Sequence, residues 1–363
     1  PALALWLRRR WPLFALGVAS LLYLAMDRWI DVPLVEPQRN MRGWLRVGSV
    51  QLQPSELMKI CYVLALAWYL RYRRNYRTFM GLVAPFAITL IPMTLILIQP
   101  DLGTVLLFLP VLFAMLFAAG AKTRHLLLII LMAVLASPLF WFQIKGYQRL
   151  RIMAVVLQSP AARQFFAERP ELWDRLQGGS AQSRTPESRA AWRRQLTEWE
   201  NETGYQLVRS KVAIGSGGLF GHGWKQGIFA EYNFLPEKHN DFIFAMIAHQ
   251  WGFVGSLLLL GCYVVLFVMG IEAATVTNDP YGRLIAVGMS TMLAFQTLVN
   301  LCVTMGLGPI TGITLPFVSA GGSSIISSFL CVGFVVSVAH RRPMLMANPP
   351  FVFDEEAEKY SVA

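Results

Sequence analysis

Long apolar segments alternate with shorter polar ones along most of the chain. A helix needs about 20 residues to cross the hydrocarbon core of a bilayer, and the apolar segments have lengths of that order. Eight of them occur, at about 11–31, 54–71, 78–99, 102–121, 125–143, 241–271, 283–307 and 323–340. None shows the alternation of apolar and polar residues that is typical of membrane strands. The pattern therefore predicts an all-α, polytopic membrane protein with eight transmembrane helices in this chain.

The composition supports the same class. Hydrophobic residues make up 55% of the chain and charged residues only 15%, whereas soluble globular domains carry about 25% charged residues. All four cysteines lie inside apolar segments, at Cys61, Cys262, Cys302 and Cys331. A secreted disulfide framework would place them in loops, so that class of protein is not expected.

The positions of the basic residues predict the orientation in the membrane. A formal net charge of +11 would suggest a nucleic-acid partner for a soluble protein. Here the positive charges gather in four clusters, at 8–10, 71–77, 122–124 and 341–342. All four fall on one side if the segments simply alternate, as the positive-inside rule expects of the cytoplasmic face. We therefore expect membrane lipids as partners, no nucleic acid, and an extracytoplasmic position for the large loop at 145–240.

This large loop changes in composition along its length. A polar insertion at about 159–203 mixes both signs of charge, which indicates a solvated surface addition. The next stretch, 204–228, contains seven glycines together with Arg209 and Lys211. It is interpreted either as a glycine-rich loop whose amides and cations bind a phosphate, or as glycines that permit close packing at the membrane surface.

Ionisable residues at the edge of a membrane are costly to hold there, so they are candidates for function. In QPSELMK, Glu56 and Lys59 are three residues apart and share a helical face, where they can pair. They form either a structural ion pair between helices or a contact with substrate. In QPDLGT, Asp101 stands at the start of an apolar segment, where an acid also favours the helix dipole.

The sequence FLPEKHND, at 234–241, places Glu237, His239 and Asp241 directly before an apolar segment. A helix cap needs only one residue, and this cluster offers several. Partial removal from water raises the pKa of a carboxylate and makes it a better base. Asp241 is therefore the candidate for a chemical role, and capping of the next helix is the simpler alternative.

A stretch rich in Gly, Pro, Ser and Thr, at 305–324, separates the last two apolar segments. Non-helical backbone at membrane depth is tolerated only where it is buried in protein or lines a cavity. We expect it to form one wall of an outward cavity, with Ser319 and Ser323 as candidate substrate contacts. The chain has only five histidines and neither an HExxH motif nor Cys/His ligand spacing, so no metal ligands are assigned.

Five motifs together resemble one known family. They are WLRVGSVQLQPSELMKI, QPDLGT, GYQLVRSKVAIGSGGLFGHGW, FLPEKHNDFIFA and TGITLPFVSAGGSS. Their order is that of the SEDS proteins (RodA, FtsW and SpoVE), and the resemblance covers about residues 40–342. The GHGWKQG stretch is similar to the RodA branch, and TGITLPFVS is nearer to FtsW and SpoVE. We interpret the chain as most like the RodA branch.

The resemblance implies a single SEDS-type transmembrane domain over 1–363, in a ten-helix protein whose first two helices precede Pro1. It implies a glycosyltransferase that polymerises lipid II into peptidoglycan during cell elongation, shape control or division. The implied location is the bacterial plasma (inner) membrane, with the active site on the extracytoplasmic face. The implied partner is a class B penicillin-binding protein.

The resemblance also implies roles for individual residues. The family's catalytic acid falls on Asp241, its QPSE-x-x-K pair on Glu56 and Lys59, and its QPD acid on Asp101. On this basis we predict that Asp241 removes the proton from the acceptor hydroxyl, with Arg209, Lys211 and Lys59 as the candidates that steady the pyrophosphate of lipid II. Further substrate contacts are expected from the remaining candidates, Glu237, His239, Ser319 and Ser323. No cofactor is assigned with certainty; a Mg²⁺ or Mn²⁺ ion that bridges a carboxylate to the pyrophosphate is an alternative.

Two other functions fit a helical membrane protein with these features. One is a flippase that moves lipid II across the bilayer, and the other is a non-catalytic scaffold for a penicillin-binding protein. A flippase should have polar groups along the whole membrane path, whereas here the ionisable residues gather near the outer face. The chain departs from the family pattern at His249 and Gln250, where acidic residues are usual, and at Ala320, where a tyrosine hydroxyl is lost.

Overall fold

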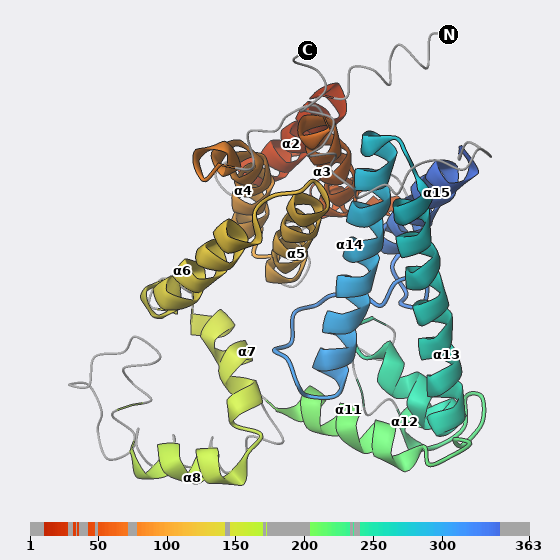
Figure 1. The fold of residues 1–363 in the computed structure, drawn as a ribbon. Coiled ribbons are helices and arrows are strands. Elements are labelled where there is room, and N and C mark those ends of the chain that lie inside the picture. The colour runs from red at the N-terminus through yellow and green to blue at the C-terminus, as the bar shows by residue number, and fades with distance from the viewer. Residues whose placement is uncertain are drawn as a thin grey trace, which may run out of the picture. The chain divides into compact units, whose positions relative to one another are not determined.

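Figure 1 shows the fold of the protein as a computed structural model. It describes residues 11–27, 32–33, 35, 43–47, 50–71, 78–141, 146–169, 172, 204–232, 235 and 240–341. Four features predicted from the sequence lie outside these ranges: the candidate residues Glu237 and His239, most of the polar insertion at 159–203, the basic cluster at 8–10, and most of the basic cluster at 71–77.

A helix occupies each of the eight predicted apolar segments, which confirms the prediction of an all-α membrane protein. These helices are α2 (Trp11–Met26), α3 (Pro54–Leu70), α4 (Val83–Ile98), α5 (Leu102–Ala118), α6 (Thr123–Trp141), α13 (Ile243–Val276), α14 (Pro280–Thr304) and α15 (Gly322–His340). Shorter helices lie in the large loop: α7 (Gly146–Val156), α8 (Pro160–Glu168), α11 (Tyr205–Ser216) and α12 (Ile228–Glu231). A 3-10 turn, η2 (Met80–Leu82), precedes α4, and β1 (Leu45–Val47) pairs with β2 (Val50–Leu52) in an antiparallel hairpin.

Four of the described helices are long and apolar enough to cross a membrane by themselves. They are Met80–Ile98, Ile243–Val276, Pro280–Thr304 and Gly322–His340. Shorter apolar helices cover Pro12–Met26, Leu102–Ala118 and Thr123–Ser137. The remaining predicted span, α3, has 17 residues and carries the charged residues Glu56 and Lys59, and a helix of that length is at the lower limit for a bilayer core.

Local sequence explains where α3 and α5 begin. Pro54 stands in the first turn of α3, where its missing N–H group is not needed. Glu56 in the same turn is stabilised by the positive end of the helix dipole. Asp101 caps α5, because its Oδ1 accepts a hydrogen bond from the Thr104 N–H at 3.0 Å. Two of the acidic candidates therefore also stabilise helix starts.

The chain divides into two compact units. Unit 1 comprises Pro1–Thr123, Cys262–Phe295 and Gly322–Ala363, and unit 2 comprises Arg124–Gly261 and Gln296–Gly321. Helices α13 and α14 each contribute one part to both units. Within unit 1, α3 packs against α2, α4, α5 and α15, so most of its side chains are buried. The fully buried Tyr62 on α3 shares a hydrogen bond of 3.0 Å with Thr89 on α4.

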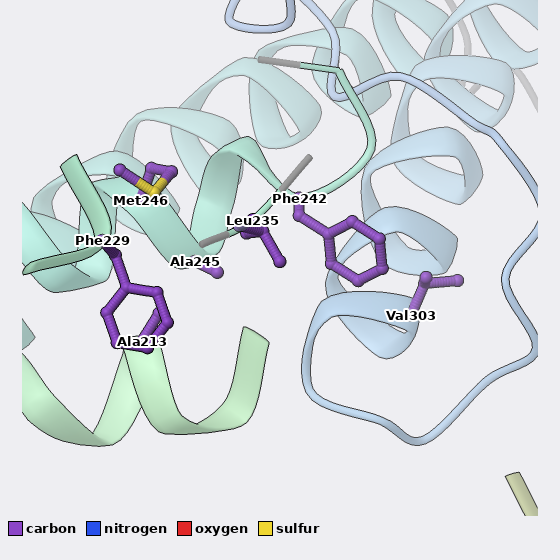
Figure 2. Close-up of a cluster of buried hydrophobic side chains, with 7 residues drawn as sticks. All are labelled: Ala213, Phe229, Leu235, Phe242, Ala245, Met246 and Val303. Atoms are coloured by element: carbon purple, nitrogen blue, oxygen red, sulfur yellow. The ribbon is translucent and has the colours of Figure 1, made fainter. Parts of the chain in front are cut away.

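Unit 2 has a small hydrophobic core that includes Phe242, the residue after Asp241 in the chain (Figure 2). Its buried side chains come from α11, α12, the segment between α12 and α13, the start of α13 and the end of α14: Ala213, Phe229, Leu235, Phe242, Ala245, Met246 and Val303. The Phe242 side chain is 0% exposed, and full burial of a phenylalanine is worth about 1.5–3 kcal/mol. Since Phe242 follows Asp241 in the chain, this burial fixes the backbone that carries the carboxylate.

The prediction of a glycine-rich loop over 204–228 is wrong for its first half. Residues Tyr205–Ser216 form helix α11, so Arg209 and Lys211 lie on a helix. Only one glycine of the stretch, Gly215, lies within this helix. Because glycines are sparse before the end of α11, helical hydrogen bonds can form there, and the dense glycines that follow end the helix. Four of these have left-handed backbone: Gly218, Gly221, Gly223 and Gly227.

Candidate functional site

Asp241 lies two residues before the start of α13 and is partly exposed. A Cβ atom added to Gly312 would lie 3.8 Å from the Asp241 Oδ2 atom. The carboxylate is therefore next to the segment 305–321, which joins α14 to α15. The sequence predicted this segment as a cavity wall, and the structure places its Gly312 in the immediate surroundings of the candidate base.

Two side chains fix the main chain of the candidate base. Asn300 on α14 donates through its Nδ2 group to the Asp241 carbonyl oxygen at 2.9 Å and to the Ile313 carbonyl oxygen at 2.7 Å. Ser319 donates through its hydroxyl to the Asn240 carbonyl oxygen at 2.7 Å. The residues before α13 are thus joined to α14 and to the segment that follows it.

Ser319 is 2% exposed, and its hydroxyl group both donates and accepts a hydrogen bond. Besides donating to Asn240, the hydroxyl oxygen accepts from the Leu315 N–H at 2.7 Å. The same turn contains Phe317 with φ of 66°, a left-handed conformation that is rare for a bulky residue. In this structure Ser319 organises the segment, and its contact with substrate stays a prediction.

Sequence reasoning missed a polar stripe on α14 that supports this arrangement. Gln296, Asn300 and Thr304 are spaced by four residues on an apolar helix and are 2%, 1% and 0% exposed. Gln296 donates to the Thr314 carbonyl oxygen at 3.0 Å, and the Thr304 carbonyl oxygen accepts from Ser210 on α11 at 2.7 Å. The four-residue spacing of uncharged polar residues was the available signal, because residues so spaced share one helical face.

Lys211 and Arg209 lie on α11, in the same unit as Asp241. The exposed Lys211 ammonium donates to the Gln158 Oε1 atom at 2.7 Å, and Gln158 donates to the Gly306 carbonyl oxygen at 2.7 Å. The Arg209 guanidinium lies over the Tyr205 ring, 5.2 Å from its centroid. Lys211 is therefore linked, through one glutamine, to the segment that borders Asp241.

Glu56 and Lys59 form a buried ion pair in unit 1. Lys59 Nζ lies 2.8 Å from Glu56 Oε1, and the two residues, Lys59 and Glu56, are 1% and 6% exposed. Glu56 Oε2 also accepts a hydrogen bond of 2.9 Å from Ser327 on α15. Burial of two charges is costly unless they are paired and hydrogen-bonded, and here the pair also connects α3 to α15. The sequence allowed either a structural ion pair or a contact with substrate. The structure contains the ion pair, and the contact with substrate stays a prediction.

Asp101 also belongs to unit 1 and is hydrogen-bonded to the Gln53 side chain. The Asp101 Oδ2 atom accepts from the Thr104 hydroxyl at 2.6 Å and from the Gln53 side chain at 3.2 Å. Burial raises the pKa of the Asp101 carboxyl, and the hydrogen bonds from Thr104 act in the opposite direction. The Gln53 N–H donates to the Ser323 hydroxyl at 3.0 Å, and that hydroxyl donates to the Gln51 carbonyl oxygen at 3.2 Å.

Those predicted site residues that the structure describes therefore fall into two groups, each within one unit. Glu56, Lys59, Asp101 and Ser323 belong to unit 1, whereas Asp241, Arg209, Lys211 and Ser319 belong to unit 2. In the part of the chain that the structure describes, no group of three or more His, Cys, Asp or Glu side chains could hold a metal ion. A role for Mg²⁺ or Mn²⁺ stays an expectation from the sequence.

These features define a class: a helical membrane protein with an acidic residue, held through its main chain, just before a membrane-crossing helix. The chain belongs to the FtsW/RodA/SpoVE family of cell cycle proteins, whose sequence model matches residues 3–164 and 189–343. The SEDS resemblance inferred from the five motifs is confirmed.

Similar proteins come from both branches of the family. The chain is 32% identical to the peptidoglycan glycosyltransferase RodA of Treponema pallidum, over 83% of this chain and 77% of that protein. It is also 32% identical to a probable peptidoglycan glycosyltransferase FtsW of Geobacter metallireducens, over 82% of this chain and 69% of that protein. Because the chain is equally identical to a RodA and to an FtsW protein, its assignment to the RodA branch stays a prediction.

A solved structure has a similar fold. It is a chain of a peptidoglycan synthase complex in which polymerization and crosslinking are coordinated. The TM-score is 0.68 at 30% sequence identity, and the match covers 93% of this chain and 83% of that one.

Proposed function

We propose that this chain is a peptidoglycan glycosyltransferase that polymerises lipid II into glycan strands. Family membership and relatives named as peptidoglycan glycosyltransferases support this activity. The observation that carries the site is the fixed position of Asp241, whose main-chain carbonyl accepts from Asn300 while the preceding carbonyl accepts from Ser319. A base that is held in place needs little reorganisation during the reaction.

In the proposed reaction, the Asp241 carboxylate accepts the proton of the acceptor sugar's 4-hydroxyl. The hydroxyl oxygen forms a bond to the anomeric carbon of the donor sugar. The bond between that carbon and the pyrophosphate oxygen breaks, and the electron pair leaves with undecaprenyl pyrophosphate. The leaving group is already activated, so the protein has to supply position, a base and stabilisation of charge.

Lys211 is proposed to stabilise the negative charge that develops on the pyrophosphate. It is exposed and lies on the same unit as Asp241. One hydrogen bond goes to Gln158, and an ammonium group has three N–H donors. Arg209, two residues earlier on α11, is a second cation for the same role. A divalent cation that bridges Asp241 to the pyrophosphate is the alternative source of this stabilisation.

A class B penicillin-binding protein is the proposed partner, because polymerised strands have to be crosslinked. The similar peptidoglycan synthase complex coordinates polymerization and crosslinking and supports this pairing. The proposed location is the bacterial inner membrane, with Asp241 on the extracytoplasmic face. The positions of the basic clusters support this orientation.

The test measures glycan strands made from labelled lipid II by the purified protein, with and without a class B penicillin-binding protein. Asp241→Asn is expected to lower the rate by about 10²–10⁴-fold, the usual contribution of a positioned general base. Glu231→Gln is the matched control, because Glu231 is an exposed acid of unit 2 outside the proposed site. Full activity of Asp241→Asn would refute the role of Asp241 as the base. If the unmodified protein makes no glycan strands even with the penicillin-binding protein, a flippase or a scaffold would be favoured. Parallel reactions with a chelator test the divalent cation.

A further inference from the structure

Helix α13 is interrupted near its N-terminal end. Gly252 has φ of 66° and ψ of −160°, which is not helical backbone. The part after the break, residues 253–276, is about 36 Å long at 1.5 Å per residue, which is enough to cross a hydrocarbon core of about 30 Å. The break therefore lies close to one end of the membrane-crossing part of the helix.

The loop after α11 provides the hydrogen bonds that the break removes. Two loop N–H groups donate to α13 carbonyl oxygens, and two α13 N–H groups donate to loop carbonyl oxygens. These pairs are His222 to His249 at 3.1 Å, Gly223 to Gln250 at 2.9 Å, Phe253 to Gly218 at 2.9 Å and Val254 to Leu219 at 3.1 Å. Because unpaired backbone groups are costly in lipid, these four hydrogen bonds hold the loop to α13 at the break. Figure 1 shows α11 and α12 beside this end of α13.

A side-chain hydrogen bond also connects α11 to the helix beside the break. The Ser216 hydroxyl donates to the Ala213 carbonyl oxygen at 2.8 Å, so its oxygen accepts from Nδ1 of His249, also at 2.8 Å. His249 is 1% exposed. The histidine that stands where the family usually has an acid therefore binds the end of α11 through an uncharged hydroxyl group.

Large apolar side chains of the loop and of α13 beside the break are exposed. Phe220 is 78% exposed and Trp224 is 67% exposed on the loop, and Trp251 is 52% exposed on α13. The Trp224 and Trp251 rings meet edge to face with centroids 6.5 Å apart. Leu219 and Ile228 are exposed on the same loop and its following helix. We call these five residues the aromatic surface.

We propose that the aromatic surface lies in the bilayer interface and binds phospholipid there. Trp251 of this surface is followed, directly after the break, by further exposed apolar side chains of α13, Phe253, Val254, Leu257 and Leu258. Tryptophan favours the headgroup level of membranes, and the exposed Lys225 next to Trp224 can reach lipid phosphates. The loop is therefore a membrane anchor that holds α11 at the bilayer surface.

Lipid fits this surface better than a sugar chain does. Aliphatic side chains, Leu219 and Ile228, accompany the aromatic ones, whereas a carbohydrate needs hydrogen-bonding groups to replace its contacts with water. The proposal depends on the helix break and the exposed residues, and it is independent of the proposed catalytic activity.

The test places a fluorescent label at the loop in lipid vesicles. Phe220→Cys is made in a chain whose native cysteines, Cys61, Cys262, Cys302 and Cys331, are replaced by serine or alanine. The labelled protein is reconstituted in phosphatidylcholine vesicles that contain nitroxide-labelled lipids. We expect blue-shifted emission, and more quenching by a nitroxide near the glycerol than by one near the chain end. Gln164→Cys on α8 is the matched control and is expected to show water-like emission without quenching, because Gln164 is exposed and donates a hydrogen bond to the side chain of Glu168.

Trp224→Cys repeats the measurement at a second position, and size-exclusion chromatography reports whether each variant is folded. The proposal is overturned if labels at both positions are quenched no more than the control label. It is also overturned if the blue shift arises only when glycan strands or a second protein are added.

Discussion

At the scale of single residues, Asn300 has the clearest consequence for the site. One amide group joins the main chain before α13 to the main chain of the segment after α14, at Asp241 and Ile313. These two carbonyl groups are far apart in sequence, so local backbone geometry does not fix their separation. We infer that Asn300 is a positioning residue for Asp241.

Asn300→Leu is expected to lower turnover more than substrate binding. The substitution removes the donor from two carbonyl groups, which costs about 1–3 kcal/mol for each buried group left unsatisfied. Gln296→Leu is the control, because Gln296 lies on the same stripe and donates to Thr314. Both variants should unfold at lower temperature, and only Asn300→Leu should lower kcat at similar KM. Equal effects of the two on kcat would mean that Asn300 has a general structural role.

The buried pair of Glu56 and Lys59 gives a second prediction at this scale. Lys59→Met leaves the Glu56 carboxylate buried without its cation, and removing one partner of such a pair costs about 3–5 kcal/mol. The double variant Glu56→Leu with Lys59→Met should recover much of the loss, as measured by thermal unfolding. Polymerisation by the double variant then separates the two interpretations. A stable and active double variant assigns the pair to structure, and a stable but inactive one assigns it to substrate.

At the scale of elements, the break in α13 depends on close backbone contact. A Cβ atom at Gly252 would collide with the Gly221 nitrogen and the Leu219 carbonyl group. Its φ of 66° is also unfavourable for any residue with a side chain.

Gly252→Ala is therefore expected to lower the unfolding temperature of the purified protein. Gly261→Ala is the matched control on the same helix, since nothing lies within 4 Å of a Cβ at Gly261. An exposed helical glycine replaced by alanine is expected to gain roughly 0.5–1 kcal/mol. If Gly252→Ala and Gly261→Ala both unfold at or above the unfolding temperature of the unmodified protein, the break is not a fixed feature of the protein.

The helices also show how much of the structure can be predicted from the sequence. Uninterrupted apolar segments predicted all eight long helices, because length and hydropathy are properties of each segment alone. The interpretation of 204–228 was wrong in its first half, since glycine content was averaged over a stretch that contains helix α11. The sequence alone was enough to select Asp241, as an acid beside an apolar segment. It could not predict the hydrogen bonds from Asn300 to Asp241 and from Ser319 to Asn240, because these join residues 59 and 79 positions apart.

At the scale of the whole molecule, the orientation in the membrane decides whether the site can meet its substrate. The basic clusters predict that Lys122 faces the cytoplasm and that Gln164 faces the opposite side. Both side chains are exposed. Helix α6, Thr123–Trp141, lies between them in sequence and includes the apolar helix Thr123–Ser137.

Single cysteines at these two positions test the orientation in intact cells with a membrane-impermeant maleimide. Gln164→Cys should react at once, whereas Lys122→Cys should react only after the membrane is permeabilised. The reverse pattern would place the large loop, and Asp241 with it, in the cytoplasm. In that case the base could not act on strands outside the cell, and the proposed polymerase would have to be abandoned even if Asp241→Asn impaired growth.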